Sequence, residues 1–308
     1  MHLDTMEGKT VVITGATSGI GLVAAETLAK MGARIIFIAR DKARAHATLD
    51  RLHRARRGLS HSIHFADLTR LSEMNQVAAQ IAEQERRIDV LINNAGAMFA
   101  TRRLTEDGLE YTFALNHISY FVLTAVLRQR LIATGAARII NTASAAHQGT
   151  ALDFDDLQSA NNFRAIRTYS RSKLCNILFT RGLARRLRGT EVTANCLHPG
   201  FVATRFGNES GGLLAVVTRL AKLFAISPAT GAETIIYLAS SPDVARVTGQ
   251  YFYRSQPISP SPAAMDDQAA LVLWERSPGE GHAAPRRIGN SRLASRGGAS
   301  PRPSPQSD

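Results

Sequence analysis

The stretch TVVITGATSGIG at residues 10–21 decides the fold, because a strand, a tight turn and the start of a helix follow one another within it. Its apolar, β-branched first half predicts a buried strand. Gly15 permits the turn, Gly19 lets backbone approach a ligand, and Gly21 allows the helix to pack closely on the sheet. The first N–H groups and positive dipole end of such a helix suit a dinucleotide pyrophosphate, although an ordinary glycine loop is the alternative.

The alternation of strand and helix continues along the chain. Further apolar runs that predict strands lie at 34–39, 62–65, 88–92, 137–142, 191–196 and 249–253. Between them, helical periodicity is visible at 20–31, 71–86, 109–131 and 169–187. Continuous apolar strands imply burial on both faces, so we predict an α/β fold. It is a Rossmann-type, doubly wound parallel sheet of about seven strands with helices on both faces.

Length and composition favour one ordered domain followed by a tail. The chain has 308 residues, and 44% of them are hydrophobic, which is ample for a core. From residue 277 the composition turns to Pro, Gly, Ser and Arg, so we predict a single domain over 1–276 and a disordered basic tail over 277–308. No apolar run reaches the ~18 residues of a spanning helix, and no signal peptide is visible. We therefore expect a cytoplasmic protein without a transmembrane segment.

The net charge of +12 raises the question of nucleic-acid binding. Arginines cluster in the tail and within residues 40–57, where we expect a solvated helix face. Aromatic residues do not interleave with them and no nucleic-acid-binding motif is present, so we expect no specific nucleic-acid partner. Cys175 and Cys196 each lie in an apolar stretch, which favours reduced core residues and predicts no metal site.

Polar and glycine-containing motifs follow six of the predicted strands. Because the carboxyl ends of parallel strands meet at one edge, where ligands bind in such sheets, these motifs predict a single cleft. In strand order they are the glycine turn, Arg40, Asp67, Asn93-Asn94-Ala95-Gly96, Ser144 and Pro199-Gly200.

The pentapeptide Tyr169-Ser170-Arg171-Ser172-Lys173 carries the chemistry. A tyrosine and a lysine four residues apart share one helix face, so an ammonium can stabilise a phenolate. A free phenol has a pKa near ~10 and needs this help for proton transfer to or from a carbonyl oxygen at neutral pH. The spacing also arises by chance, with a solvated lysine beside a half-buried aromatic. Together with the glycine turn, it indicates hydride chemistry.

The residue after the second strand bears on the choice of cofactor. Arg40 suits a 2′-phosphate, which favours NADP(H) over NAD(H). Asp41 is either a helix N-cap or a ribose acceptor. Asp67 either accepts from the adenine amino group or caps the next helix. Asn94 and Gly96 pass close to the adenosine or form a plain turn.

Six motifs resemble those of the short-chain dehydrogenase/reductase family over roughly residues 7–276. They are TGATSGIG at 14–21, NNAG at 93–96, Asn116 in ALNHISYFVLT, Ser144 after RIINTA, YSRSK at 169–173, and HPG at 198–200 with Thr204. Within the family, SKLCNILFTRGLARRL, TANCLHPGFVATRF, TGQYFY and LWERS are similar to the retinol dehydrogenase-like branch.

The resemblance implies four catalytic residues. Tyr169 would exchange a proton with the substrate oxygen, and Lys173 would stabilise its phenolate and bind the nicotinamide ribose. Ser144 would orient the carbonyl, and Asn116 would hold a water that relays protons from Lys173. Taken singly, each has a structural alternative: a surface charge for Lys173, a strand-end cap for Ser144 and a helix-bending polar residue for Asn116.

The resemblance also implies the cofactor contacts. Val202 and Thr204 would clamp the nicotinamide carboxamide, with transfer of the pro-S hydride. The complete predicted set is Gly15, Thr17, Ser18, Gly19, Ile20, Gly21, Arg40, Asp67, Leu68, Asn94, Ala95, Gly96, Tyr169, Lys173, Pro199, Gly200, Val202 and Thr204.

Two segments bear on the substrate. The 24 residues between Ser144 and Tyr169 are predicted to edge the substrate mouth, and an apolar helix after Gly211-Gly212 is predicted to form a lid or an oligomer contact. We expect an apolar aldehyde, ketone or alcohol, with retinoids, steroids, lipid aldehydes and xenobiotic ketones all open, and reduction as the direction. The alternative function is a regulator that binds NADP(H) without turnover.

Overall fold

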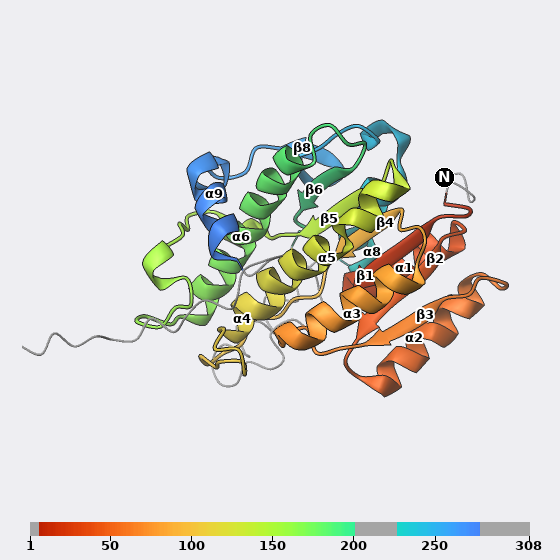
Figure 1. Ribbon diagram of the computed structural model, residues 1–308, viewed down its shortest axis with the longest axis horizontal. Helices are drawn as coiled ribbons and strands as arrows, with labels where there is room; N and C mark the ends of the chain where they lie inside the picture. Colours follow the sequence, from red (N-terminus) through yellow and green to blue (C-terminus); the bar gives the residue numbers. More distant parts are fainter. Residues whose placement is uncertain (1–5, 201–226, 278–308) are drawn as a thin grey trace, which may run out of the picture.

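The computed structural model describes residues 6–200 and 227–277, and in this part of the chain eight strands form one sheet (Figure 1). The spatial order is β3-β2-β1-β4-β5-β6-β7-β8, with β1 to β7 parallel and β8 antiparallel to β7. The bounds are β1 Thr10–Thr14, β2 Arg34–Ala39, β3 Ser62–Phe65, β4 Val90–Asn93, β5 Arg138–Thr142, β6 Thr193–Leu197, β7 Tyr251–Tyr253 and β8 Gln256–Ile258.

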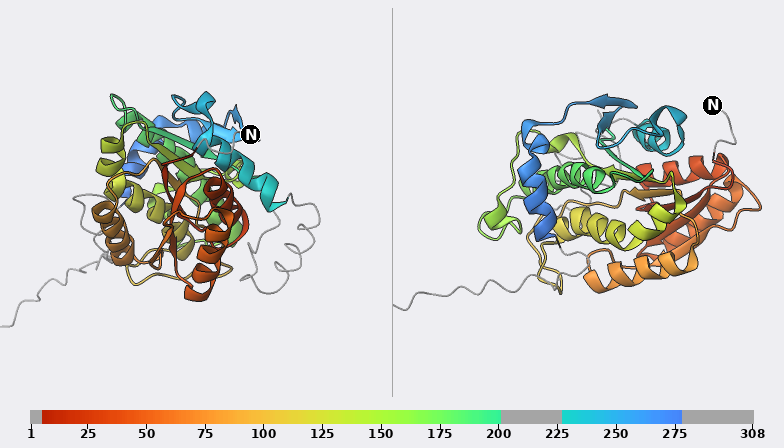
Figure 2. Two further views of the ribbon diagram at one scale, coloured as in Figure 1. Left: turned by 90° about the vertical axis from the view of Figure 1, so that its right-hand side faces the viewer. Right: turned by 45° about the horizontal axis from the view of Figure 1, so that its top comes forward.

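Helices cover both faces of the sheet, as the two views in Figure 2 show. The longer ones are α1 Gly19–Lys30, α2 Lys42–Ala55, α3 Leu71–Gln84, α5 Ser119–Thr134, α6 Ala165–Arg186, α8 Pro228–Ser240 and α9 Asp267–Arg276. Short turns of helix are α4 Tyr111–Phe113, the π-helix η1 Ala114–Ile118, and the 3-10 turns η2 Ala145–His147, η3 Phe154–Asp156, η5 Pro242–Val244 and η6 Pro262–Met265.

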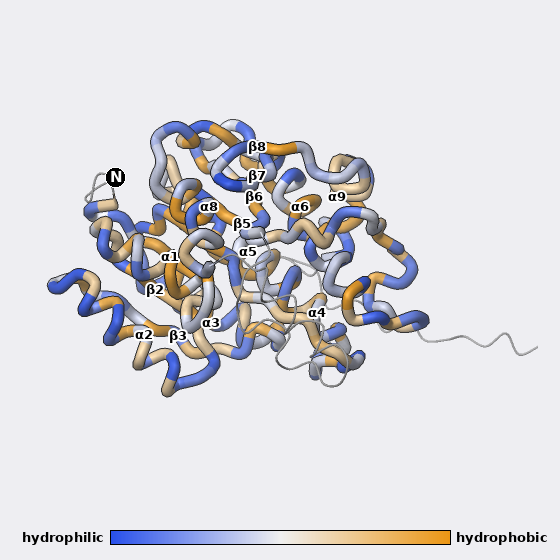
Figure 3. Tube along the Cα trace, turned by 180° about the vertical axis from the view of Figure 1, so that it is seen from behind, coloured by the Kyte–Doolittle hydropathy of each residue, from blue (hydrophilic) through white to orange (hydrophobic). Residues whose placement is uncertain are grey.

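Two apolar clusters sandwich the sheet. Adjacent residues of β1 point to opposite faces, so Val12 belongs to the cluster under α3, α5 and α6, while Ile13 belongs to the cluster under α1, α2 and α8. Both side chains are fully buried. Figure 3 shows the corresponding pattern, with hydrophobic segments at the centre and hydrophilic segments along the periphery. The β-branched strands are therefore buried on both faces, as the sequence predicts.

The order of the strands reverses between β1 and β4. β1 is followed by α1 on one face and β4 by α5 on the other, and in such sheets the ligand crevice forms at the carboxyl ends of these two neighbouring strands. This position is where a doubly wound sheet binds its ligand.

The predicted fold class is confirmed, and two helix boundaries of the prediction are wrong. The sheet also has an eighth strand, β8, which has no apolar signal in the sequence because its three residues are exposed and include Pro257. The helix predicted over 109–131 begins only after Glu110, whose carboxylate caps it, and widens into η1 before α5 continues. Helix α6 begins at Ala165, four residues before Tyr169.

Several predictions fall on residues that the structure does not describe. These are the lid after Gly211-Gly212, the clamp at Val202 and Thr204, and most of the tail. Ser277, the first residue of the predicted tail, is buried behind α9. Cys175 and Cys196 are buried and not disulfide-bonded. Within residues 6–200 and 227–277, no helix is long and apolar enough to cross a membrane, and no cluster of metal-ligating side chains is found.

Candidate active site

The glycine turn after β1 and the NNAG turn after β4 are bonded to each other. The Thr14 hydroxyl oxygen accepts hydrogen bonds from the backbone N–H groups of Asn94 and Ala95, both at 2.9 Å. The Asn94 amide donates back to the Thr14 carbonyl at 3.1 Å. Side chains at the ends of two neighbouring strands thus fix these two turns to each other.

Glycine is required at two positions of the first turn. Gly15 has φ +71°, a conformation that residues with a Cβ rarely adopt, and a Cβ there would lie 2.9 Å from the Ala95 Cα. A Cβ at Gly21 would lie 2.3 Å from the Gly15 carbonyl oxygen. The backbone of α1 therefore starts in direct contact with the turn.

The start of α1 offers free backbone donors to a ligand. Ser18 is the N-cap of this helix but its side chain accepts no capping hydrogen bond, and Gly19 and Ile20 form the first turn, with Thr17 just before the cap. The N–H groups of a first helical turn have no partner within the helix. An anionic pyrophosphate at this end would be stabilised by them and by the helix dipole.

The two residues after β2 are a helix cap, Asp41, and an exposed cation, Arg40. Asp41 is the N-cap of α2, with its carboxylate accepting from the Arg44 N–H at 2.9 Å, so the helix-cap alternative is confirmed. That bond lowers the pKa of Asp41. The Arg40 side chain is 62% exposed, and its guanidinium lies 3.6 Å from the Asp67 carboxylate.

Asp67 and Leu68 follow β3. One oxygen of Asp67 accepts from both the N–H and the hydroxyl of Thr69, at 3.0 and 2.8 Å, so Asp67 closes a turn before α3 begins. Its other oxygen is the one near Arg40. Leu68 is buried in the core below the crevice. The structure thus places an acid and a buried aliphatic residue where adenine binding is predicted.

Lys173 is buried at the centre of the site. Its ammonium donates to the Thr142 carbonyl at 3.0 Å and lies 5.6 Å from the centre of the Tyr169 ring. The Tyr120 ring lies at 5.7 Å on its other side. Burial lowers the pKa of Lys173 to about 7. The surface-charge alternative for this lysine is therefore wrong.

Tyr169 is half-buried and belongs to the same site. Burial raises the pKa of its phenol to about 12, and a hydrogen bond with Ser144 acts in the opposite direction. The phenol is therefore protonated near neutral pH, while its hydroxyl remains within hydrogen-bonding distance of Ser144. Sequence spacing brought Tyr169 and Lys173 together on α6, and the fold adds Ser144 from the segment after β5.

The turn η2 positions Ser144. The Ser144 hydroxyl accepts from the Ala146 N–H at 3.2 Å, which makes it the cap of η2. His147 is fully buried, and its Nδ1 lies 2.7 Å from the Ser144 carbonyl oxygen while its Nε2 accepts from the Ser261 N–H at 3.1 Å. Because Nε2 is an acceptor, Nδ1 carries the proton and donates to Ser144.

Asn116 lies in the π-helix η1 with its side chain fully buried. Its amide exchanges two hydrogen bonds of 2.9 Å with the Ala97 backbone and donates to the Ser172 hydroxyl at 3.0 Å. A Cβ at Gly96 would lie 3.1 Å from the Asn116 Oδ1 and 3.3 Å from the Lys173 Nζ. Asn116 and Lys173 therefore border the same small space, which glycine keeps open.

Three residues of the site were missed by sequence reasoning. His147 holds Ser144, Thr142 provides the carbonyl under Lys173, and the Asn176 amide donates to that same carbonyl at 3.2 Å. A signal existed for two of them. His147 follows Ser144 by three residues, and Asn176 follows Lys173 by three and so lies on the same helix face.

Pro199 and Gly200 lie after β6, at the same edge of the sheet as the other motifs. Gly200 has φ +84°, and its N–H donates to His198 at 3.2 Å. The predicted site residues that the structure describes therefore lie in the segments that follow the strands at the carboxyl edge, on α6, or, for Asn116, in η1. Val202 and Thr204 lie outside the described residues.

Comparison with known proteins agrees with this geometry. The family model described as short chain dehydrogenase matches residues 9–211. Human retinol dehydrogenase 14 is 40% identical over 288 residues, covering 88% of this chain and 86% of that protein. Human retinol dehydrogenase 13 is also 40% identical, over 283 residues that cover 89% and 84% of the two chains.

Solved structures with the same architecture are also found. The crystal structure of an uncharacterised protein from Mycobacterium paratuberculosis is 32% identical, with a TM-score of 0.68, and the match covers 87% of this chain and 91% of that one. A protein of Beutenbergia cavernae, assigned as an NAD(P)-dependent gluconate 5-dehydrogenase and solved with bound NADP, is 27% identical with a TM-score of 0.65. That match covers 82% and 97%.

Proposed function

Because the chain belongs to the short-chain dehydrogenase family of NAD(P)-dependent oxidoreductases acting on CH–OH groups, we propose that it reduces an apolar aldehyde or ketone to its alcohol with NADPH. Tyr169 is the general acid, and it is the base in the reverse reaction. The observation that carries the proposal is a buried ammonium, Lys173, beside a half-buried phenol that is hydrogen-bonded to Ser144.

The residues of the crevice fit a dinucleotide. The turn at Gly15 and the start of α1 leave donors for a pyrophosphate, and neither Gly15 nor Gly21 has room for a Cβ. When bound, the cofactor supplies the hydride. In the proposal, Lys173 holds the nicotinamide ribose, and Val202 and Thr204 hold the carboxamide.

The protonation states support reduction as the physiological direction. At neutral pH a phenol with a pKa near 12 carries its proton and can donate it to a carbonyl oxygen. The phenolate left on Tyr169 is stabilised by the Lys173 ammonium and by the hydrogen bond with Ser144. Asn116, which borders the same space as Lys173, is proposed to hold the water that returns the proton.

Arg40 and Asp41 support a preference for NADP(H). Asp41 is occupied as the cap of α2, so it is not free to accept a ribose hydroxyl. Arg40 is exposed, and its exposed ion pair with Asp67 contributes little stabilising free energy. The guanidinium can therefore exchange this partner for a 2′-phosphate. We expect Arg40→Glu to raise the KM for NADPH at least tenfold more than the KM for NADH, measured by steady-state kinetics with one carbonyl substrate. Similar changes in both KM values would contradict this assignment.

The substrate class rests on the branch of the family that the chain resembles. Relatives named retinol dehydrogenases act on a long apolar alcohol, and we propose a long apolar carbonyl compound for this chain as well.

The test of the function is NADPH oxidation, followed by absorbance, over a panel of apolar aldehydes and ketones. The wild-type protein is expected to consume NADPH with at least one of them. Tyr169→Phe is expected to lower kcat by at least ~1000-fold while leaving the NADPH dissociation constant within about twofold, since it removes only the proton donor. Binding of NADPH without turnover of any compound would instead support the regulator, and retained activity in Tyr169→Phe would refute the role of the phenol.

A further inference from the structure

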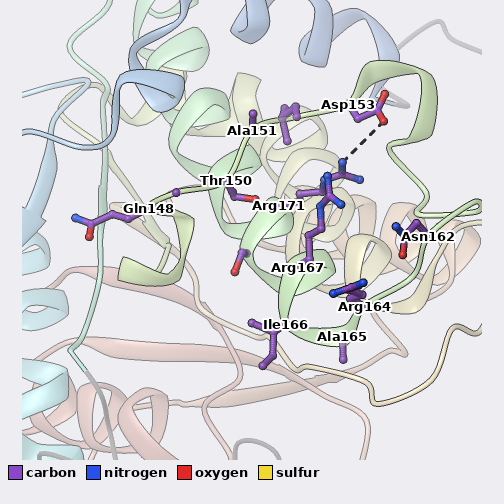
Figure 4. A pocket seen from close by; sticks show the side chains of 13 residues that line it. Gln148, Thr150, Ala151, Asp153, Asn162, Arg164, Ala165, Ile166, Arg167 and Arg171 are labelled. Carbon is purple, nitrogen blue, oxygen red and sulfur yellow. Dashed lines mark ion pairs between the residues drawn. The ribbon is translucent and has the colours of Figure 1, made fainter.

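A cavity of about 1090 Å³ lies between the segment that follows η2 and the first turns of α6 (Figure 4). It is distinct from the dinucleotide crevice, since its walls come from the 24 residues between Ser144 and Tyr169 and from α6 itself. The apolar part of its wall is formed by Ala151, Leu152 and Ile166.

The cavity is basic. Arg164, Arg167 and Arg171 line it, and Asp153 is the one acidic residue among its lining residues. Arg164 and Arg167 are exposed, and neither forms an ion pair with any other residue in the described part of the chain. The Asp153 carboxylate is partly used within its own turn, because one of its oxygens accepts from the N–H groups of Asp155 and Asp156.

Arg171 is the buried charged residue of the cavity. Its side chain is only 8% exposed, yet it is incompletely paired: one terminal nitrogen donates to the Asp156 carbonyl at 3.3 Å, and the other lies 3.9 Å from the Asp153 carboxylate. Its Nε is buried and has no hydrogen-bond partner. The Nε is enclosed by protein, and each terminal nitrogen makes a single long contact, so the terminal N–H groups have capacity for a further acceptor.

The start of α6 adds to the positive potential. Its N-cap, Arg164, makes no side-chain capping bond, and the first residues of the helix, Ala165, Ile166 and Arg167, all line the cavity. Their N–H groups have no partner within the helix. Three guanidinium groups, free backbone donors and the positive end of a 22-residue helix therefore meet around one apolar-walled space.

The cavity and the active site share helix α6. Tyr169 is on the opposite side of the helix from Arg167 and Arg171, and Ile166 and Ser170 lie between these two sides. A ligand that passes Ile166 and Ser170 therefore connects the catalytic phenol with the arginines, over a length on the order of the ~10 Å helix diameter.

We propose that this cavity binds an anionic group, a carboxylate or a phosphate, at the far end of a long carbonyl substrate. The inference rests on the proposed function and deepens it, because it makes the substrate amphipathic: a carbonyl at Ser144 and Tyr169, an apolar chain along Ile166, and an acidic end among the arginines. A purely apolar substrate leaves Arg164 and Arg167, which line the cavity, without an anionic partner.

The kinetic test compares two aldehydes of equal length, ω-oxododecanoate and its methyl ester. In the wild-type protein we expect kcat/KM for the acid to exceed that for the ester by about tenfold or more, from charge-assisted hydrogen bonds. In the double variant Arg164→Gln/Arg167→Gln the ratio is expected to fall below about threefold. Arg86→Gln, an exposed arginine at the opposite edge of the sheet, is the matched control and is expected to keep the wild-type ratio.

A binding measurement separates the cavity from catalysis. Calorimetric titration of the full chain with dodecanoate, dodecyl phosphate and dodecanol is expected to show binding of the two anions that weakens at least tenfold in the double variant, and the tighter anion identifies the headgroup. Equal kcat/KM for acid and ester, with anion binding unchanged in the double variant, would overturn the proposal and leave the reductase function intact. Anion binding that depends on the arginines, with neither aldehyde reduced, would support the anion site and refute the proposed function.

Discussion

At the scale of single residues, the charge of Lys173 is set by burial. The ammonium has lost most of its water, and it donates a hydrogen bond to a neutral carbonyl, that of Thr142. Its pKa is therefore near 7 instead of 10.5. A lysine that exchanges its proton near neutral pH suits a site that must resupply a proton to Tyr169 after each reduction.

The same shift predicts how stability depends on pH. Between pH 7 and 10.5 the unfolded state holds the Lys173 proton and the folded state does not, so the free energy of unfolding rises with pH in this window. Below pH 7 the folded state also holds the proton, and the full cost of burying the ammonium lowers the stability. Lys173→Met removes this titration. In urea unfolding without cofactor, we expect the stability of wild type relative to Lys173→Met to increase by a few kcal/mol from pH 7 to pH 10.

The control for this measurement is Lys30→Met, at the exposed end of α1, for which the difference from wild type is expected to stay constant. A wild-type advantage that shrinks or stays level as the pH rises would contradict the assigned shift of Lys173.

At the scale of elements, the short turn η2 connects Ser144 to the segment that precedes η6. Its His147 bonds the Ser144 carbonyl on one side and the Ser261 N–H, before η6, on the other. Burial lowers the pKa of His147, which keeps the ring neutral and keeps Nε2 an acceptor. The position of the Ser144 hydroxyl thus depends on a residue that does not touch the substrate.

Substitutions of His147 should separate positioning from folding. His147→Phe removes both hydrogen bonds, and a displaced Ser144 is expected to lower kcat ten- to hundredfold. His147→Asn keeps a donor for the Ser144 carbonyl and is expected to recover part of that loss. The NADPH dissociation constant, measured by fluorescence titration, should stay within about twofold in both variants. Equal kcat in both variants, or parallel losses in kcat and cofactor affinity, would show that His147 only supports the fold.

Two elements of the structure, β8 and η1, leave no pattern in the sequence that predicts them. The β-branched runs predicted seven strands, because burial on both faces leaves a continuous apolar signal. The exposed strand β8 carries no such signal. The π-turn at Asn116 was not visible either, since an i+5 hydrogen bond changes the backbone without changing the apolar period of its neighbours.

At the scale of the whole molecule, the last described helix, α9, packs against α6. Trp274 packs on Phe179 with ring centres 5.6 Å apart and lies under the Arg186 guanidinium, 3.9 Å from the ring centre. The Ser277 hydroxyl then lies 3.1 Å from Nε2 of His117, a fully buried residue of η1. The body of the protein therefore extends through Ser277, one residue past the predicted boundary.

This boundary gives a prediction for truncation. Removal of residues 278–308 is expected to leave kcat/KM unchanged and the Tm within about 2 °C, because the contacts of α9 are all retained. Removal from Asp267 onward exposes Phe179 and the core around it, and we expect loss of soluble protein or a Tm lower by more than 10 °C. Thermal unfolding of the two shortened chains measures this, and a large loss from the first truncation would contradict the proposed domain limit.

The sequence by itself determined the fold class, the carboxyl edge that carries the site and the pairing of Tyr169 with Lys173, because each follows from short-range periodicity or from spacing on one helix. Only the tertiary structure decided that Asp41 is a cap and that His147 holds Ser144. It also decided that three arginines meet in one cavity. These contacts join residues that are close in sequence, but residue spacing left their partners open, because the backbone conformation and the packing around each side chain decide which partner it takes.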